Sequence, residues 1–398
     1  MFKKAFILTL CLLLALGSVG CSKTPDTKPS DPTPYKTMAT QAVADLLSHW
    51  WVGTARSGHL LPTISGYHRT DHPGQIWNTA MLIFPIYDLW FLTGDDQYRQ
   101  LLLAEAQWFK EYYTLEDLEI AGEGPSHPWS DDCAWSALAY LTLYNVTEDS
   151  WFLDRAINLL DSVMDRWYNE EKDFLYYRDD VDVMSYYESG MALAWLRIWE
   201  ITGEQRFYDL SLASYSRVQK NLGRDDGLYY CEATVYWATG NKDAIGEAGS
   251  SSALAGNMCM AALSAKFYKI TGDQTYLDRV YLTNQGLLKY YDKDGVLLND
   301  RDAWTNATFA GIYVSEVLSL PDTAEMQALI FGTAHSIFHN ARTDDGYYGG
   351  SWQGPAEGPT SIWYLKGSVP QQSITSGTSI MMITAAALLE AGITDLNR

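Results

Sequence analysis

The chain has 398 residues, of which 49 are acidic and 28 are basic, so its formal net charge is −21. A surface this acidic excludes nucleic acids and anionic polymers as partners, because both bind in basic grooves. It is compatible with a neutral substrate, and the 15 tryptophans and 27 tyrosines could supply aromatic rings of the kind on which neutral sugars stack.

The first twenty residues have the pattern of an export signal. Lys3 and Lys4 precede an apolar run from Ala5 to Leu16 that is short for a membrane-spanning helix. The end of this run resembles a bacterial lipoprotein cleavage box, Leu16-Gly17-Ser18-Val19-Gly20-Cys21. The resemblance implies that Cys21 becomes a lipidated N-terminus, which would anchor the protein to a membrane of the bacterial cell envelope on the outer-membrane, surface or periplasmic side. An ordinary signal peptide is the alternative.

The next stretch is rich in Pro, Ser and Thr and predicts an extended linker. We therefore expect three parts. They are a lipoprotein signal peptide at 1–20, a flexible tether at 21–37 and one folded domain at 38–398.

A short turn recurs along the folded domain. Its threonine falls at positions 93, 147, 202 and 271, at intervals of 54, 55 and 69 residues. Each copy joins two amphipathic helical patterns, and Leu320-Pro321-Asp322 is a degenerate fifth copy. Repeats of this length indicate stacked helical hairpins.

Twelve helical patterns fall into two sets. One set follows long loops and is rich in Ala, Gly, Ser and Met, as expected for helices packed on both sides: 76–92, 131–146, 186–201, 250–270, 303–318 and 373–391. The other set carries more charge, as expected for an outer ring: 38–52, 95–113, 149–167, 204–220, 273–291 and 322–340. The predicted fold is therefore all-α, an (α/α)6 toroid of six helical hairpins.

The connections between hairpins are long and must share one face, because the short hairpin turns occupy the other. Tight turns within them predict small β-hairpins at Lys172-Asp173, Asp226-Gly227 and Asp345-Gly346. Long loops on a rigid scaffold are where functional sites are usually built.

Two neighbouring carboxylates, Asp131 and Asp132, open the second inner helix on this long-loop face, after Ser130 as the N-cap. A purely capping role is one interpretation, because acids complement the helix dipole. The flanking Trp129 and Trp135 favour chemistry instead. Glycosidic bond cleavage needs two carboxyl groups, and adjacent residues suit the roughly 5–5.5 Å separation of retaining enzymes. Close like charges also help to keep one carboxyl protonated.

Together with the recurring turns, two motifs resemble glycoside hydrolase family 76, the endo-α-1,6-mannanases: Asp131-Asp132-Cys133-Ala134-Trp135 and Trp352-Gln353-Gly354-Pro355. The resemblance implies retaining hydrolysis of α-1,6-linked mannan without a metal or other cofactor. It assigns Asp131 as the nucleophile and Asp132 as the acid/base. The chain departs from the family at Glu188, where an asparagine is usual, and the exact sugar and linkage therefore stay open.

Further residues at the predicted site face are candidates for substrate binding, each with packing as the alternative. They are Trp129, Tyr187, Glu188, Asp300, Trp304 and Trp352, the last as a sugar platform in a glycine-rich loop. The three cysteines beyond the signal and lipid box show no C-x-x-C spacing and imply no zinc site.

The leading interpretation is a monomeric, lipid-anchored glycoside hydrolase that acts on a neutral polysaccharide or oligosaccharide, α-mannan. One alternative is a glycan-binding lipoprotein of the same fold without catalysis. Another is a different six-hairpin activity, such as an unsaturated glucuronyl hydrolase or a sugar epimerase. A glucuronyl hydrolase would need basic residues to bind its uronate substrate, and an epimerase usually relies on histidines. The predicted site face is poor in both kinds of residue.

Overall fold

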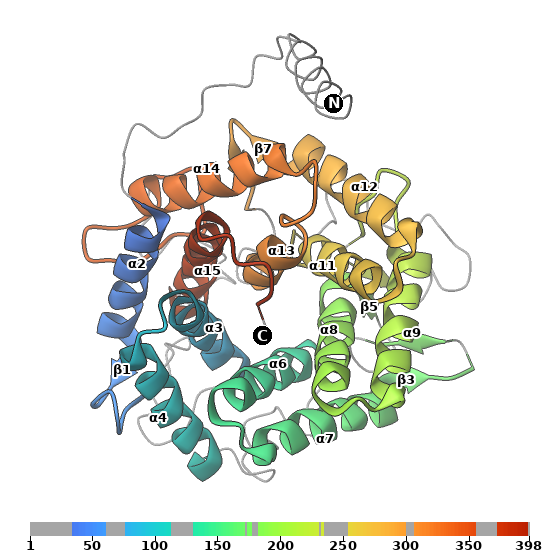
Figure 1. Ribbon diagram of the computed structural model, residues 1–398, viewed down its shortest axis with the longest axis horizontal. Helices are drawn as coiled ribbons and strands as arrows, with labels where there is room; N and C mark the ends of the chain where they lie inside the picture. Colours follow the sequence, from blue (N-terminus) through green and yellow to red (C-terminus); the bar gives the residue numbers. More distant parts are fainter. Residues whose placement is uncertain are drawn as a thin grey trace, which may run out of the picture. The chain divides into compact units, whose positions relative to one another are not determined.

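Two concentric rings of helices account for most of the described chain (Figure 1). The computed structural model describes residues 34–60, 76–112, 130–171, 173–176, 182–230, 232–234, 254–299, 306–355 and 372–396. The predicted signal peptide, most of the tether and Cys21 lie outside these residues.

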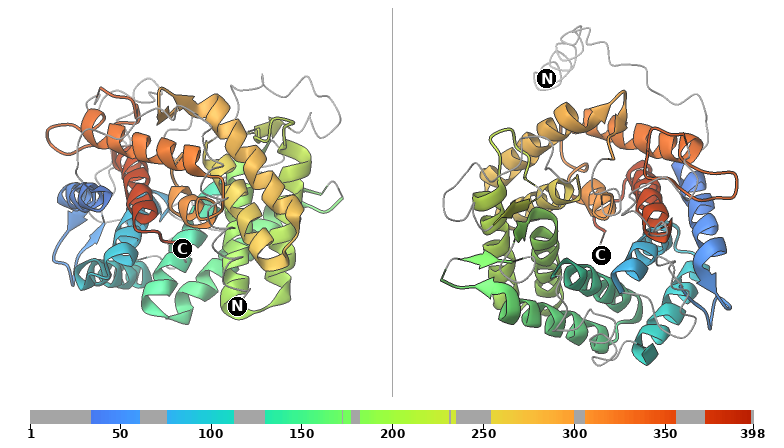
Figure 2. Two further views of the ribbon diagram at one scale, coloured as in Figure 1. Left: turned by 45° about the horizontal axis from the view of Figure 1, so that its top comes forward. Right: turned by 180° about the vertical axis from the view of Figure 1, so that it is seen from behind.

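Each of the twelve helices in the described residues matches one predicted from the sequence. The outer ring contains α2 (Tyr35–Trp50), α4 (Asp96–Tyr112), α7 (Ser150–Trp167), α9 (Gln205–Leu222), α12 (Gln274–Tyr291) and α14 (Ala324–Asn340). The inner ring contains α3 (Ile76–Thr93), α6 (Ser130–Thr147), α8 (Ser185–Thr202), α11 (Leu254–Thr271), α13 (Ala310–Glu316) and α15 (Gln372–Glu390). The predicted all-α toroid is confirmed, and Figure 2 shows the two rings from two further sides.

The two rings differ in burial as their composition predicts. Inner helix α8 is buried continuously from Ser185 to Leu196, because it packs between its inner neighbours and the outer ring. Outer helix α7 buries only one stripe, at Phe152, Ala156, Leu159, Leu160, Val163 and Trp167. This three-to-four-residue spacing is the amphipathic pattern of a helix with one solvent face.

Helix α15 closes the ring by packing against both α2 and α3. Its segment Ser373–Glu390 is long and apolar enough for a membrane span, but 83% of it is buried inside the protein. Packing in the inner ring therefore explains its composition. The carboxylate of Glu390 accepts a hydrogen bond from the backbone N–H of Lys36 (3.2 Å), so the two ends of the folded domain meet.

The recurring turn is a compact hydrogen-bonded unit. The hydroxyl of Thr93 donates to the carbonyl of Leu89 (2.7 Å) and accepts from the N–H of Asp95 (3.2 Å). Gly94 adopts a left-handed φ of 64°, and the carboxylate of Asp95 caps the next helix by accepting from the N–H of Gln97 (2.9 Å). The threonine contacts recur at Thr147, Thr202 and Thr271.

In the part of the connections that the structure describes there are four two-stranded antiparallel sheets: β1 (Trp51–Val52) with β2 (His59–Leu60), β3 (Tyr168–Asn169) with β4 (Phe174–Leu175), β5 (Asp182–Met184) with β6 (Glu232–Thr234), and β7 (Asp292–Lys293) with β8 (Val296–Leu297). The hairpin predicted at Lys172-Asp173 is β3–β4. The two predicted Asp-Gly hairpins are smaller, and each closes a single antiparallel bridge, Gly223 with Tyr229 and Arg342 with Tyr348.

The hairpin turns predict a reciprocal pair of stability effects. Glu148 and Gly203 occupy the same position in two copies of the recurring turn, and both have a left-handed backbone, with φ of 56° and 72°. A Cβ added at Gly203 would contact nothing within 4 Å, so a side chain there causes no steric clash. Because this conformation costs an L-residue roughly 1–2 kcal/mol, Glu148→Gly should raise the free energy of unfolding by about 1 kcal/mol, and Gly203→Glu should lower it similarly. Urea denaturation checks both, and changes of the same sign in the two variants would contradict the assignment.

Candidate active site

The inner helices are parallel to one another. Each follows a long connection. Five run towards a short hairpin turn and α15 ends beside the start of α2, so all six N-termini lie at the long-loop end of the ring. The positive ends of their dipoles converge there, and this environment favours carboxylates and developing negative charge. Acid-based chemistry is therefore best supported at this end.

Asp132 lies in the first turn of α6 at this end and is buried, with 8% of its surface exposed. The backbone of Asp131 belongs to the same turn, while its side chain is outside the described residues. The predicted doublet thus sits at the start of an inner helix, as the sequence indicated.

An aromatic cluster lies one helical turn further along α6. Trp135 follows Asp132 by three residues and therefore shares its helix face. Its ring is parallel to that of Tyr186 from α8, with centroids 6.2 Å apart, and contacts that of Phe309 at 5.3 Å. Gly190 makes room for this contact, because a Cβ there would lie 3.3 Å from the Phe309 ring. The cluster packs in the inner ring one turn beyond Asp132, with Trp135 and Phe309 each 1% exposed and Tyr186 8%.

Two of the candidate binding residues point away from this cluster. The Tyr187 hydroxyl donates to the carbonyl of Leu175 in β4, and its side chain has no exposed surface. Glu188 is also buried and pairs with Arg217 of outer helix α9 (Nε–Oε1 2.7 Å). A helix turns about 100° per residue, so Tyr186 alone of the three faces the Trp135 cluster. The substrate contacts of Tyr187 and Glu188 stay predictions.

Trp352, predicted as a sugar platform, is buried, and its role in substrate binding stays a prediction. Its ring has 0% exposure, and its indole N–H donates to the hydroxyl of Ser379 in α15 (3.0 Å). The glycine-rich loop lies across an inner helix, so the ring fills core space after all. Trp129, Asp300 and Trp304 lie outside the described residues, and their predicted roles stay predictions.

Sequence reasoning missed Phe309 and did not select Tyr186 above its two neighbours. The 3.6-residue period of α8 carried the signal for Tyr186, because residues 186, 189 and 190 share one face and 187 and 188 point elsewhere. Nothing in the sequence around Phe309 distinguishes it from an ordinary core residue.

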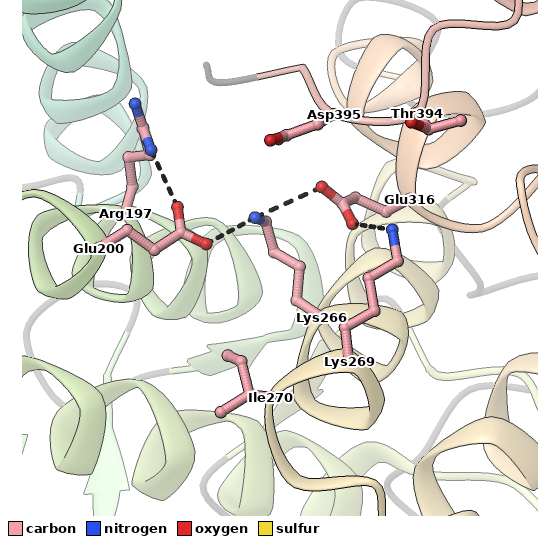
Figure 3. A pocket seen from close by; sticks show the side chains of 8 residues that line it. All are labelled: Arg197, Glu200, Lys266, Lys269, Ile270, Glu316, Thr394 and Asp395. Atoms are coloured by element: carbon pink, nitrogen blue, oxygen red, sulfur yellow. Dashed lines mark hydrogen bonds and ion pairs between the residues drawn. The ribbon is translucent and has the colours of Figure 1, made fainter.

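The opposite end of the ring is a different environment. A pocket of about 400 Å³ lies there, lined by the last turns of α8, α11 and α13 and by Thr394 and Asp395 (Figure 3). Its charges pair with one another: Lys266 with Glu200 (2.7 Å) and Glu316 (3.4 Å), Lys269 with Glu316, and Arg197 with Glu200. Burial alone would lower the pKa of Lys266, but the acids around it raise it, so this cation stays charged.

The cations and acids that line this pocket therefore offset one another, and the cations lie near helix C-termini, where the helix dipole favours positive charge. Among the described residues no cluster of three or more His, Cys, Asp or Glu side chains could hold a metal ion at either end.

A second buried carboxyl lies near the long-loop end. Glu105 of α4 is fully buried and accepts a hydrogen bond from the N–H of Leu60 at the end of β2 (2.7 Å). Burial raises its pKa to about 8, although the Leu60 N–H opposes the shift. Burial likewise raises the pKa of Glu188 to about 7 in spite of the opposing Arg217.

The sequence pattern of glycosyl hydrolase family 76 matches residues 34–372, which include all the elements of the site described above. The chain belongs to glycosyl hydrolase family 76. Membership confirms the resemblance seen in the sequence and supports glycoside hydrolase activity on a carbohydrate. No curated protein matches the chain.

Solved structures with the same fold are distant in sequence. The GH76A alpha-1,6-mannanase from Salegentibacter sp. HEL1_6 is 17% identical, with a TM-score of 0.66 over 89% of this chain and 99% of that one. An inactive variant of that enzyme, with two consecutive aspartates replaced by asparagine and alpha-1,6-mannotriose bound, has a TM-score of 0.65 at 17% identity over 89% and 99%. The Lin0763 protein from Listeria innocua gives 0.68 at 18% identity over 90% and 98%.

The buried Glu105 predicts a pH dependence of stability in this family 76 member. Its folded pKa lies above the ordinary value of 4.5, so its contribution to stability is complete below about pH 4.5 and is lost as the pH rises towards 8. The free energy of unfolding should fall by up to about 1.4 kcal/mol per pH unit in this window. Glu105→Gln should flatten the curve, which urea denaturation at pH 5, 6, 7 and 8 measures. Parallel curves for the two proteins would contradict a neutral Glu105.

Proposed function

We propose that this protein is a retaining glycoside hydrolase that cleaves α-1,6-mannosidic linkages in α-mannan. The observation that carries the proposal is the acid doublet in the first turn of α6, where Asp132 is buried beside the Trp135 cluster at the long-loop end. The relative with α-1,6-mannotriose bound supports it, because that enzyme was made inactive by replacing two consecutive aspartates.

The proposed mechanism has two displacements. Asp131 attacks the anomeric carbon, and the glycosidic C–O bond breaks while Asp132 donates its proton to the leaving oxygen. Asp132 then takes a proton from water, whose oxygen attacks the same carbon and releases Asp131. Each displacement inverts the anomeric centre, so the product keeps the configuration of the substrate.

Proton NMR during hydrolysis of α-1,6-mannan tests both parts of this proposal. We expect shortened oligosaccharides whose newly formed reducing ends appear first as the α-anomer. A β-anomer would overturn the retaining mechanism, and binding of mannan without cleavage would favour the glycan-binding alternative.

Substitution of either acid should remove activity. Asp131→Asn and Asp132→Asn each abolish a proton-transfer or nucleophilic role, so we expect kcat to fall by about 10²–10⁴-fold or more. Asp96→Asn is a matched control, because Asp95-Asp96 is also an acid doublet at a helix start but lies at the opposite end of the ring. Near-normal mannan hydrolysis by either Asp131 or Asp132 variant would refute the assignment.

We also propose that the enzyme is a monomer anchored to the bacterial cell envelope through lipid on Cys21. The cleavage-box pattern of residues 16–21 and the following proline-rich tether support this localisation. In a bacterial host, Cys21→Ala should block incorporation of labelled fatty acid and move the protein out of the membrane fraction. Unchanged labelling would rule out lipidation at this residue.

A further inference from the structure

A buried charge network joins α8 to α9, next to the helix face that carries the Trp135 cluster. Arg217 of α9 donates from Nε to Glu188 (2.7 Å) and from Nη2 to the hydroxyl of Ser214 (2.7 Å). Its Nη1 lies 3.4 Å from a carboxylate oxygen of Asp173, and its guanidinium lies over the ring of Tyr168, 5.1 Å from the centroid. The side chains of Arg217 and Glu188 are only 6% and 4% exposed.

The network attaches the first turn of α8 to the outer ring. Glu188 joins this turn to α9, and Tyr187 joins it to the carbonyl of Leu175 in the β3–β4 hairpin. Asp173 and Tyr168, which themselves share a hydrogen bond (3.2 Å), bring the same hairpin to Arg217. Two consecutive residues of α8 are therefore held from outside.

The residue before these two, Tyr186, contacts the aromatic cluster beside the acid doublet. Tyr186 faces inwards, and its ring lies parallel to that of Trp135, one helical turn from Asp132. A shift or rotation of the first turn of α8 would move the ring of Tyr186 relative to that of Trp135. It would therefore also move Tyr186 relative to the N-terminal turn of α6, which contains Asp132. The outward contacts of Tyr187 and Glu188 set the position of the inward ring.

We propose that Glu188 and Arg217 are positioning residues that fix the first turn of α8, and through the contact of Tyr186 with Trp135 the first turns of α6 that carry Asp132. The proposal rests on the hydrolase function proposed above. A buried ion pair is a poor source of stability, because apolar residues of similar volume often replace it without loss. A directional, multi-point contact is instead suited to fixing an orientation, and Arg217 uses its whole planar fork in this way.

The conservative and disruptive variants separate positioning from stability. Glu188→Gln keeps an acceptor for Arg217 Nε, whereas Glu188→Ala removes it. On α-1,6-manno-oligosaccharides, measured at the same interval below each variant's Tm, we expect kcat to fall about 10–100-fold in Glu188→Ala and less than about threefold in Glu188→Gln. Arg217→Lys loses the fork and should resemble Glu188→Ala.

Lys266→Met is the matched control. It removes an equally buried ion-paired cation, 10% exposed, from the opposite end of the ring (Figure 3). We expect it to lower Tm while leaving kcat and KM unchanged. If Glu188→Ala behaves in the same way, with a lower Tm but normal kcat and KM, the pair is only structural and the proposal is overturned.

A second readout is independent of the substrate. Hydrogen–deuterium exchange should rise in Glu188→Ala at residues 185–190 and also at residues 131–136, with α11 unchanged. Normal exchange at 131–136 would overturn the coupling to α6. A wild-type protein that fails to cleave α-1,6-manno-oligosaccharides would refute the proposed substrate, and the exchange result would still decide the positioning role.

Discussion

Burial of the inner helices along most of their length is the constraint on which this structure depends. A helix packed on every side can offer chemistry to solvent only at its ends, because its side walls are already occupied. The parallel order of the six inner helices then makes the two ends of the ring electrically unlike. The acid doublet of α6 lies where the N-termini converge, and Lys269 lies in the last turn of α11 at the other end, each complementing the local dipole.

The outer ring contributes more than a cover for apolar surface. Arg217 reaches inwards from α9 to Glu188, and the Asp45 carboxylate of α2 similarly receives Arg342 (Nε–Oδ2 2.8 Å) and the Tyr348 hydroxyl (2.9 Å) from the loop after α14. Both networks tie a connection at the long-loop end to helices of the rigid scaffold. Connections that would otherwise be held only by their ends acquire fixed points close to the site.

The sequence predicts the scaffold well, because its signals are local and repeated. Helix periodicity and the Thr-Gly-Asp turn act within a few residues, and the turn specifies its own hydrogen bonds at Thr93 and its later copies. The acid doublet could be placed at a helix start on the same local grounds.

Side-chain orientation and long-range pairing were less predictable. Tyr186 and Glu188 point in different directions because each residue of a helix is rotated about 100° from the one before it. Sequence patterns do not define a helix start to within one residue, so they could not decide which of the two faces inwards. The burial of Trp352 depends on a loop crossing α15, and the pairing of β5 with β6 joins segments about fifty residues apart. These features arise from tertiary contacts that no local pattern encodes.

The meeting of the first and last helices bears on how the chain folds as it is made. Five hairpins are each contiguous in sequence, but the sixth pairs α2 with α15, which are separated by more than three hundred residues. During synthesis, α2 and α3 emerge long before the helix that covers them. The apolar faces of α2 and α3 therefore stay uncovered until translation ends. A chaperone would be most needed between the synthesis of these two helices and the synthesis of α15.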